Sequence, residues 1–104
     1  MSREVRVVVQ DWLFTWNSQK ADANLEKHEV SFEEALEVFF FPYYDMEDAS
    51  VPDEQRWSVI GYSMRDRLLY VVAVERGEEA WRIISARPAT RTERARYEEK
   101  DDSY

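Results

Sequence analysis

His28 is the one side chain here whose ordinary pKa lets it gain and lose a proton near neutral pH. It is the only histidine among 104 residues, and it directly follows Lys27. Arginines are frequent in the second half of the sequence, and their planar guanidinium groups bind phosphate oxygens through paired hydrogen bonds. One histidine combined with several cations indicates chemistry at a phosphate group.

Cleavage of RNA by its own 2′-hydroxyl is the phosphate reaction that fits these residue types. It requires a base for the hydroxyl proton, donors that stabilise the phosphorane and an acid for the leaving oxygen. It requires neither a metal ion nor a protein nucleophile. We assign the base to His28 and the acid to Tyr97 or Lys27. The phosphate charge would be neutralised by Arg56, Arg82 or Arg87.

Further cations could hold the RNA backbone. Lys20 lies on the same predicted helical stripe as Lys27, and Arg91 and Arg94 share a face of a later helix. We expect these three residues and Arg82 to contact RNA. A simpler interpretation stays open for every cation, since charged stripes are usual on solvated helix and sheet faces. His28 could likewise bond only the last carbonyls of its helix.

Other kinds of site are disfavoured by the composition. Cysteine is absent, which removes disulfides, thiolate nucleophiles and cysteine-based zinc sites. With only two glycines there is no phosphate-binding glycine loop, and no Gly-x-Ser-x-Gly motif is present. A metal site would rest on one histidine and on carboxylates that are more simply interpreted as helix face and loop. We therefore expect no metal and no cofactor.

The charge distribution is uneven along the chain. The net charge is −8 overall, but residues 1–55 carry −9 and residues 56–97 carry +4. A uniformly acidic surface repels nucleic acid over about 8 Å at physiological salt, whereas a local arginine-rich face can still bind it. No apolar run approaches the roughly 20 residues that cross a bilayer, and the N-terminus is too short and too charged for a signal peptide. We expect a soluble, cytoplasmic protein of one domain.

Sequence patterns predict one strand and two helices in the first half. A run of β-branched residues indicates a strand within 3–14. Asn17 or Ser18 could cap a helix over 19–28. Ser31 with Glu34 forms a capping-box pattern, which starts a second helix with apolar residues at helical spacing. That helix should end before Pro42.

The second half predicts strands followed by a helix. Strand signals cover 56–63, 68–74 and 80–87, with a short edge strand near 49–51. The short links between the three longer strands favour an antiparallel meander, and a helix is expected over 91–100. The fold class is therefore α+β, with a mostly antiparallel sheet flanked by helices. We also expect Arg82 and Arg87 to project from one face of their strand.

Two motifs are the most specific in the sequence, Lys27-His28-x-Val30-x-Phe32 and Ile83-Ile84-Ser85-Ala86-Arg87. The residues that continue them in order and spacing are Phe14, Trp16, Asn17, Lys20, Asn24, Ala35, Arg56, Trp57, Gly61, Leu68 to Val72, Arg82, Ala89, Glu93, Tyr97 and Glu98. Together they resemble the BrnT family of ribonuclease toxins. The resemblance covers about residues 14–99, which leaves 1–13 as an N-terminal extension and 100–104 as an acidic tail.

The resemblance implies a RelE-like fold and an RNA-cleaving toxin that inhibits translation and growth. It also implies a tight complex with an antitoxin of the BrnA type, which binds DNA and could mediate dimerisation. Glu29 stands where the family usually has glycine, so a positive φ there would strain the backbone or change the turn. A relative that keeps only partner binding and does not cut RNA is the alternative function.

Overall fold

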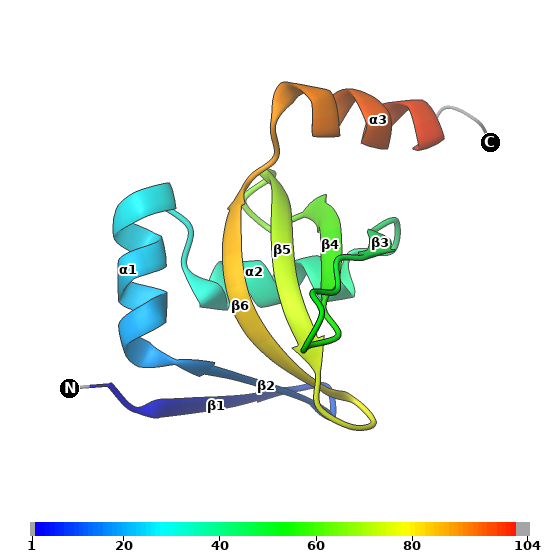
Figure 1. Cartoon of the computed structure of the whole chain (residues 1–104). Helices are drawn as coiled ribbons and strands as arrows, with labels where there is room; N and C mark the ends of the chain where they lie inside the picture. Colours follow the sequence, from blue (N-terminus) through cyan, green and yellow to red (C-terminus); the bar gives the residue numbers. More distant parts are fainter. Residues whose placement is uncertain (1, 102–104) are drawn as a thin grey trace.

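A six-stranded sheet runs through the protein in the order β1-β2-β6-β5-β4-β3 (Figure 1). The computed structural model describes residues 2–101. The strands are β1 (Glu4–Val9), β2 (Trp12–Asn17), β3 (Asp45–Asp48), β4 (Trp57–Tyr62), β5 (Leu68–Glu75) and β6 (Ala80–Pro88). The helices are α1 (Ser18–His28), α2 (Phe32–Leu36), the 3₁₀ turn η1 (Glu37–Phe40) and α3 (Arg91–Asp101).

The α+β class is confirmed, but the sheet is mixed. Strands β3 to β6 form the expected antiparallel meander, with the edge strand at Asp45–Asp48 and not at 49–51. Strand β2 instead pairs with β6 in the parallel direction. The helices and strands between them make a crossover far longer than a hairpin, and a parallel pair requires such a connection.

Residues 3–14, expected to form one strand, form most of a hairpin. The chain turns at Gln10 and Asp11, whose φ angles of 50° and 70° are those of a two-residue hairpin turn. Neither residue is glycine or asparagine, and the β-branched run continues up to the turn, so no clear turn signal is present. The expected boundary between extension and core at residue 13 lies inside β2.

The two helix starts follow the predicted caps. The Asn17 side chain accepts hydrogen bonds from the backbone N–H groups of Gln19 and Lys20, at 3.0 and 3.1 Å. The Ser31 hydroxyl accepts from the Glu34 N–H at 3.0 Å. The Glu34 carboxylate does not complete this capping box, because it bonds an arginine and a serine from the β4–β5 turn.

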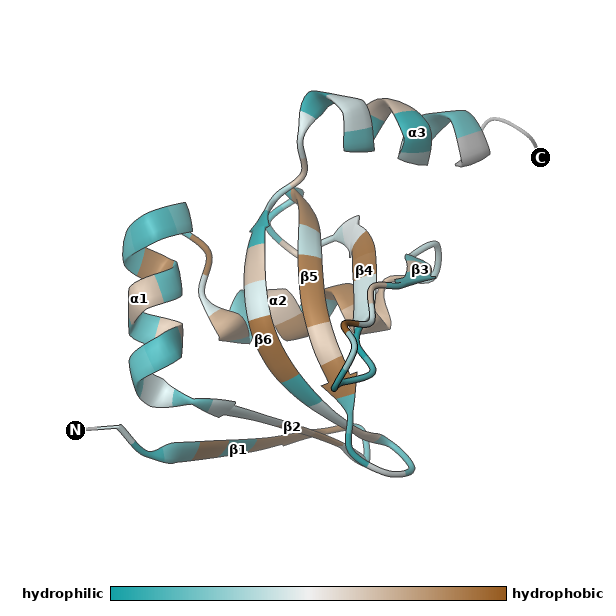
Figure 2. Ribbon diagram, in the orientation of Figure 1, coloured by the Kyte–Doolittle hydropathy of each residue, from teal (hydrophilic) through white to brown (hydrophobic). Residues whose placement is uncertain are grey.

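Aromatic side chains fill the core between the sheet and the α2–η1 segment. Phe14 and Trp81 from two neighbouring strands both contact Phe39 of η1, with ring centroids 5.3 Å apart in each case. Trp16 meets Phe32 edge to face. Figure 2 shows the hydrophobic residues concentrated on the central strands, whereas α3 is hydrophilic along most of its length. The helices of the described chain include none long and apolar enough to cross a bilayer.

A bulge in β6 decides where its two arginines point. Arg82 and Arg87 are five residues apart, so a regular strand would place them on opposite faces. The register between β5 and β6 shifts by one residue near Ile84, and the pairs become Val74 with Arg82 and Tyr70 with Arg87. Both arginines therefore project from the face opposite the core. The shared face agrees with the expectation, but the alternation of a regular strand would not have produced it.

Thr90 and Glu93 form a complete capping box at the start of α3. The Glu93 N–H donates to the Thr90 hydroxyl at 3.1 Å, and the Thr90 N–H donates to the Glu93 carboxylate at 2.9 Å. Helix α3 therefore begins where the sequence predicts, and it crosses one end of the sheet (Figure 1). Residues 102–104 of the expected acidic tail lie outside the described part of the chain.

Candidate functional site

Asn24 fixes α1 against the part of β6 that extends beyond its pairing with β2. This buried side chain donates to the Ala86 carbonyl at 2.8 Å and accepts from the Ala86 N–H at 3.2 Å, as a neighbouring strand would. It also donates to the Val30 carbonyl at 3.0 Å, which holds the connection to α2. One asparagine thus sets the height of α1 relative to β6.

Because of this attachment, His28 and Arg87 lie at a similar height along the direction of β6. His28 lies one helical turn, about 6 Å, beyond Asn24. Arg87 lies one residue, about 3.3 Å, beyond Ala86 in the same direction (Figure 1). His28 is half-buried at the end of α1 and Lys27 is exposed. The histidine is therefore not sealed in the interior.

A buried carboxylate ties the β4–β5 turn to the same end. Glu34 is 4 % exposed, and it accepts hydrogen bonds from Arg67 Nε at 2.9 Å and from Ser63 Oγ at 2.7 Å. Arg67 Nη2 also donates to the Glu29 carbonyl, next to His28, at 2.9 Å. The guanidinium and then the serine hydroxyl lower the pKa of Glu34, while burial opposes them. Arg65, largely exposed, lies 3.6 Å from the same carboxylate.

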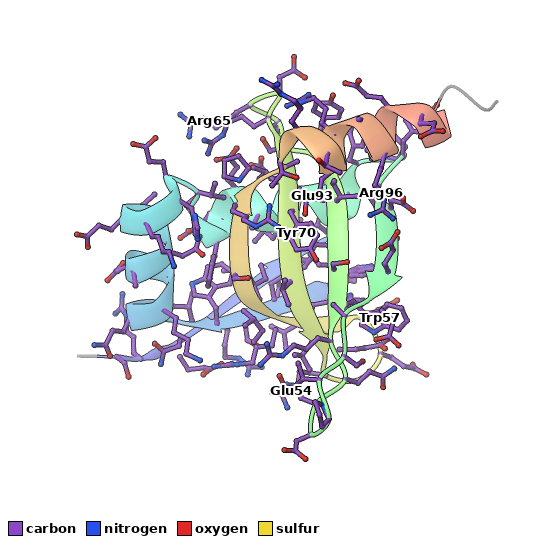
Figure 3. All side chains as sticks on the ribbon, turned by 45° about the horizontal axis from the view of Figure 1, so that its top comes forward. Glu54, Trp57, Arg65, Tyr70, Glu93 and Arg96 are labelled. Atoms are coloured by element: carbon purple, nitrogen blue, oxygen red, sulfur yellow. The ribbon has the colours of Figure 1, made fainter. Side chains whose placement is uncertain are left out.

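Arg87 is held between a carboxylate and an aromatic ring. Its two terminal nitrogens donate to the two oxygens of Glu93 at 2.8 and 2.9 Å, and its Cζ lies 4.3 Å from the centre of the Tyr70 ring. Figure 3 shows Tyr70 and Glu93 close together beneath α3. The Arg87 guanidinium, followed by the Thr90 N–H, lowers the pKa of Glu93 to about 2 against the opposing effect of burial. Glu93 in turn raises the pKa of Arg87.

We call this region the His28 end of the sheet. Four separate segments contribute to it: the end of α1, the β4–β5 turn, the end of β6 and the start of α3. One backbone bond joins the link between β6 and α3 to the start of β5, since the Ala89 N–H donates to the Leu68 carbonyl at 2.8 Å. Besides His28, the cationic residues of this end are Lys27, Arg65, Arg67, Arg87 and Arg91.

Arg65 and Arg67 were not among the predicted site residues. They flank Asp66 in the link between two strands, where the sequence argument considered only the turn. Asp66 adopts a φ of 63°, so the turn is tight and both arginines are held at the sheet end. Two arginines separated by one residue in a short turn were the signal available in the sequence.

Three predicted cations lie at the opposite end, which we call the hairpin end. Arg82 pairs with Glu4 of β1 and contacts Thr15 of β2. Arg56 donates to Glu54 at 2.6 Å, and Figure 3 shows Glu54 at the far end of the sheet from Arg65. The Arg56 guanidinium lowers the pKa of Glu54, and Lys20 and Arg76 add to this effect. Arg82 therefore does not lie in one group with Lys27, His28 and Arg87.

The reason is the length of β6. Because of the bulge, Arg82 and Arg87 pair with β5 residues four positions apart, Val74 and Tyr70, which amounts to roughly 13 Å. The N-terminal hairpin also brings a glutamate directly to Arg82. A shared face was not sufficient to bring the two guanidinium groups together.

Tyr97 and Arg94 lie on α3, over β4. The Tyr97 hydroxyl donates to the Tyr43 carbonyl at 2.9 Å, and its ring packs edge to face on Tyr62. Arg94 lies 3.4 Å from the Tyr62 hydroxyl and 3.8 Å from Glu98. Tyr97 also lines a pocket of about 140 Å³ between α3 and strands β3 to β5. Within residues 2–101 no group of three potential metal ligands occurs.

Comparison with known proteins agrees with this architecture. The family model for the ribonuclease toxin BrnT of type II toxin–antitoxin systems matches residues 16–93. Among solved structures, the chain is similar to the Brucella abortus ribonuclease toxin BrnT, with 28% sequence identity and a TM-score of 0.60. That match covers 73% of this chain and 94% of the Brucella chain. No curated protein sequence matches significantly. The chain therefore belongs to the BrnT family of type II toxin–antitoxin ribonuclease toxins.

Proposed function

We propose that this toxin is a metal-independent endoribonuclease whose active site is the His28 end of the sheet. The observation that carries the proposal is the attachment of α1 to β6 through Asn24, which sets His28 level with Arg87. The turn bearing Arg65 and Arg67 is tied to the residue after His28. A base and several phosphate-binding groups from distant parts of the chain are thereby collected at one exposed sheet end.

The reaction follows from the roles these groups can take. His28 accepts the proton of the 2′-hydroxyl, whose oxygen then forms a bond to the adjacent phosphorus. Arg87 and Arg65 bind the phosphate oxygens and stabilise the charge of the phosphorane. The bond from phosphorus to the 5′-oxygen breaks, and Lys27 supplies the proton to that leaving oxygen. The products are a 2′,3′-cyclic phosphate and a 5′-hydroxyl.

Four residues first considered for catalysis or RNA binding have no role in this scheme. Lys20, Arg56 and Arg82 lie at the hairpin end, where Arg56 and Arg82 have carboxylate partners. The Tyr97 hydroxyl is bonded to a backbone carbonyl under α3. Arg91 and Arg94, on the first turns of α3, are retained as contacts to the RNA backbone beyond the cleaved bond.

Family membership implies an antitoxin partner. We propose that this partner is of the BrnA type, binds DNA through another part of its chain, and could bring two toxin chains into one complex. The core of the fold is proposed to be RelE-like, with β1 added at one edge of the sheet. Free toxin would cleave cytoplasmic RNA and stop translation and growth.

The test is RNA cleavage by the purified chain in EDTA. We expect cleavage to persist in EDTA and to be lost in the His28→Ala/Arg87→Ala double variant, which should still unfold cooperatively, at a midpoint lowered by the loss of the Arg87–Glu93 pair. Glu26→Ala, on an exposed surface of α1, is the matched control and should cleave normally. Wild-type chain that leaves RNA intact across a series of salt concentrations would overturn the proposal.

The ion pairs favour a second candidate, a partner-binding module without catalysis. Arg67 and Arg87 both have carboxylate partners, so RNA phosphate must compete with Glu34 and Glu93 for them. A module of this kind would bind its antitoxin but neither cut RNA nor arrest growth on expression. Expression of wild type beside the His28→Ala/Arg87→Ala variant separates the two functions, because only a nuclease gives different growth curves.

A further inference from the structure

Strand β1 is the outermost strand of the sheet, and no other helix or strand of residues 2–101 lies beyond it (Figure 1). It pairs with β2 over all six residues without a bulge. The two-residue turn makes Val9 and Trp12 a hydrogen-bonded pair. Val9, Val7 and Val5 therefore direct their backbone N–H and C=O groups toward β2. Glu4, Arg6 and Val8 accordingly turn theirs outward.

This edge lacks most of the features that protect the edges of natural sheets. Such edges commonly carry a proline, a bulge, a lysine or a covering loop, and otherwise they pair with another strand. β1 contains no proline or lysine, its register is regular, and Val8 is 68 % exposed. The hydrophobic part of β1 is visible at the sheet margin in Figure 2. The edge is therefore open to a seventh strand.

The charges on β1 are self-complementary. Glu4 and Arg6 lie two residues apart, on the face that Glu4 shares with Arg82. An antiparallel copy of β1 centred on Val5 would place Glu4 opposite Arg6 of the second copy, twice by symmetry. In this register the outward N–H and C=O groups of Glu4 and Arg6 would bond those of Arg6 and Glu4 in the second copy. A register centred on Arg6 would instead oppose two arginines.

We propose that β1 pairs with β1 of a second copy of this chain, in the register centred on Val5, and joins two sheets into one of twelve strands. The family match begins at residue 16, inside β2, so β1 lies before the region shared with the family model. The proposal concerns association alone and is independent of the proposed ribonuclease activity.

Sedimentation of the purified chain, without any antitoxin, tests the association. We expect a monomer–dimer equilibrium over about 10 to 200 µM, the range for a small transient interface. Arg6→Pro removes only an outward N–H and should raise the dissociation constant at least tenfold while keeping the fold. Arg6→Glu should do the same, and Glu4→Arg/Arg6→Glu should restore the dimer because the charges are again complementary. A chain that stays monomeric throughout, or a dimer that Arg6→Pro does not weaken, would overturn the proposal.

The absence of native cysteine allows the register to be tested by cross-linking. Val5→Cys places the new thiol beside its own copy, so oxidation should give a disulfide-linked dimer. Val9→Cys, on the same face four residues away, is the matched control and should remain uncross-linked. A cross-linked dimer from Val7→Cys but not from Val5→Cys would overturn the register. RNA cleavage should be unchanged in all of these variants, so a negative result here leaves the proposed function standing.

Discussion

The two ends of the sheet contain similar residues in different arrangements. At the hairpin end, Arg56 and Arg82 each have a carboxylate partner, and no histidine is near. At the His28 end, Arg67 and Arg87 also have carboxylate partners, but Arg67 is bonded to the residue that follows the one histidine of the chain. Arginine content alone therefore does not locate a phosphate site. What distinguishes the ends is the buried network that collects several segments around His28.

The buried polar groups explain why this end is built as it is. Asn24 and Glu34 are both nearly inaccessible to solvent, and each bridges segments far apart in sequence. Unsatisfied buried groups are costly, so these residues specify one arrangement of α1, β6 and the turn. The hairpin end has no counterpart among the described residues, since its Glu4–Arg82 pair is solvent-exposed on the glutamate side.

The largest difference between the ends should appear in catalysis. Loss of a general base typically reduces a rate by a factor of about 10² to 10⁴, so His28→Ala should lower RNA cleavage at least 100-fold. Arg82→Ala should change it less than about threefold, because a remote surface cation adds only general electrostatic attraction. Initial cleavage rates of the two variants check this. Comparable losses from both would remove the distinction between the ends.

Stability should respond next most strongly, at Asn24. Asn24→Ala leaves the Ala86 N–H and two carbonyls without their partner, and we expect it to lower the free energy of unfolding by about 2–4 kcal/mol. Glu4→Ala at the hairpin end should leave the denaturation midpoint close to that of wild type. Urea denaturation followed by tryptophan fluorescence measures both. An Asn24→Ala chain as stable as wild type would show that α1 is held by something else.

The Arg87–Glu93 pair should make the His28 end sensitive to acid. The folded-state pKa of Glu93, about 2, lies below its ordinary value of 4.5. Its stabilising contribution is therefore fully present above about pH 4.5 and is lost as the pH falls toward 2. Partial exposure reduces the contribution to about 1–2 kcal/mol. Between pH 6 and pH 2.5, the free energy of unfolding should fall less steeply for the Glu93→Gln chain than for wild type. The same slope in both chains would contradict the pairing.

The smallest expected effect is at Glu29, next to His28. Glu29 adopts φ 58° and ψ 31°, a left-handed conformation that glycine takes without steric cost. Glu29→Gly should therefore raise the free energy of unfolding by about 0.5–1 kcal/mol. Glu26→Gly, in the interior of the same helix, should lower it by a similar amount. If both substitutions destabilise the chain, the turn at Glu29 carries no strain.

Local patterns in the sequence predicted the elements better than their arrangement. The caps at Asn17, Ser31 and Thr90 placed three helix starts, and the second-half strands agree to within one residue at most ends. The N-terminal hairpin was missed because Gln10-Asp11 is not a typical turn pair. The parallel pairing of β2 with β6 depends on long-range packing, which local patterns do not report.

The candidate site was predictable in part. His28, Lys27 and Arg87 were identified from residue type and resemblance, and the structure brings their segments to one end. Arg82 was grouped with them because a shared face was expected to bring it near Arg87, and its Glu4 partner cannot be inferred from spacing. Asn24 and Glu34 were overlooked as organisers, since a polar residue inside a helix gives no sign of which distant backbone it will bond.

The central claim is that RNA binds at the His28 end, and backbone amide shifts test it most directly. ¹⁵N-labelled chain would be titrated with RNA carrying 2′-O-methyl groups, which removes the attacking hydroxyl and prevents cleavage. The largest shifts are expected on residues 27–29, 65–67 and 87–94. Largest shifts at residues 4–6, 54–56 and 80–82 would place RNA at the hairpin end and contradict it.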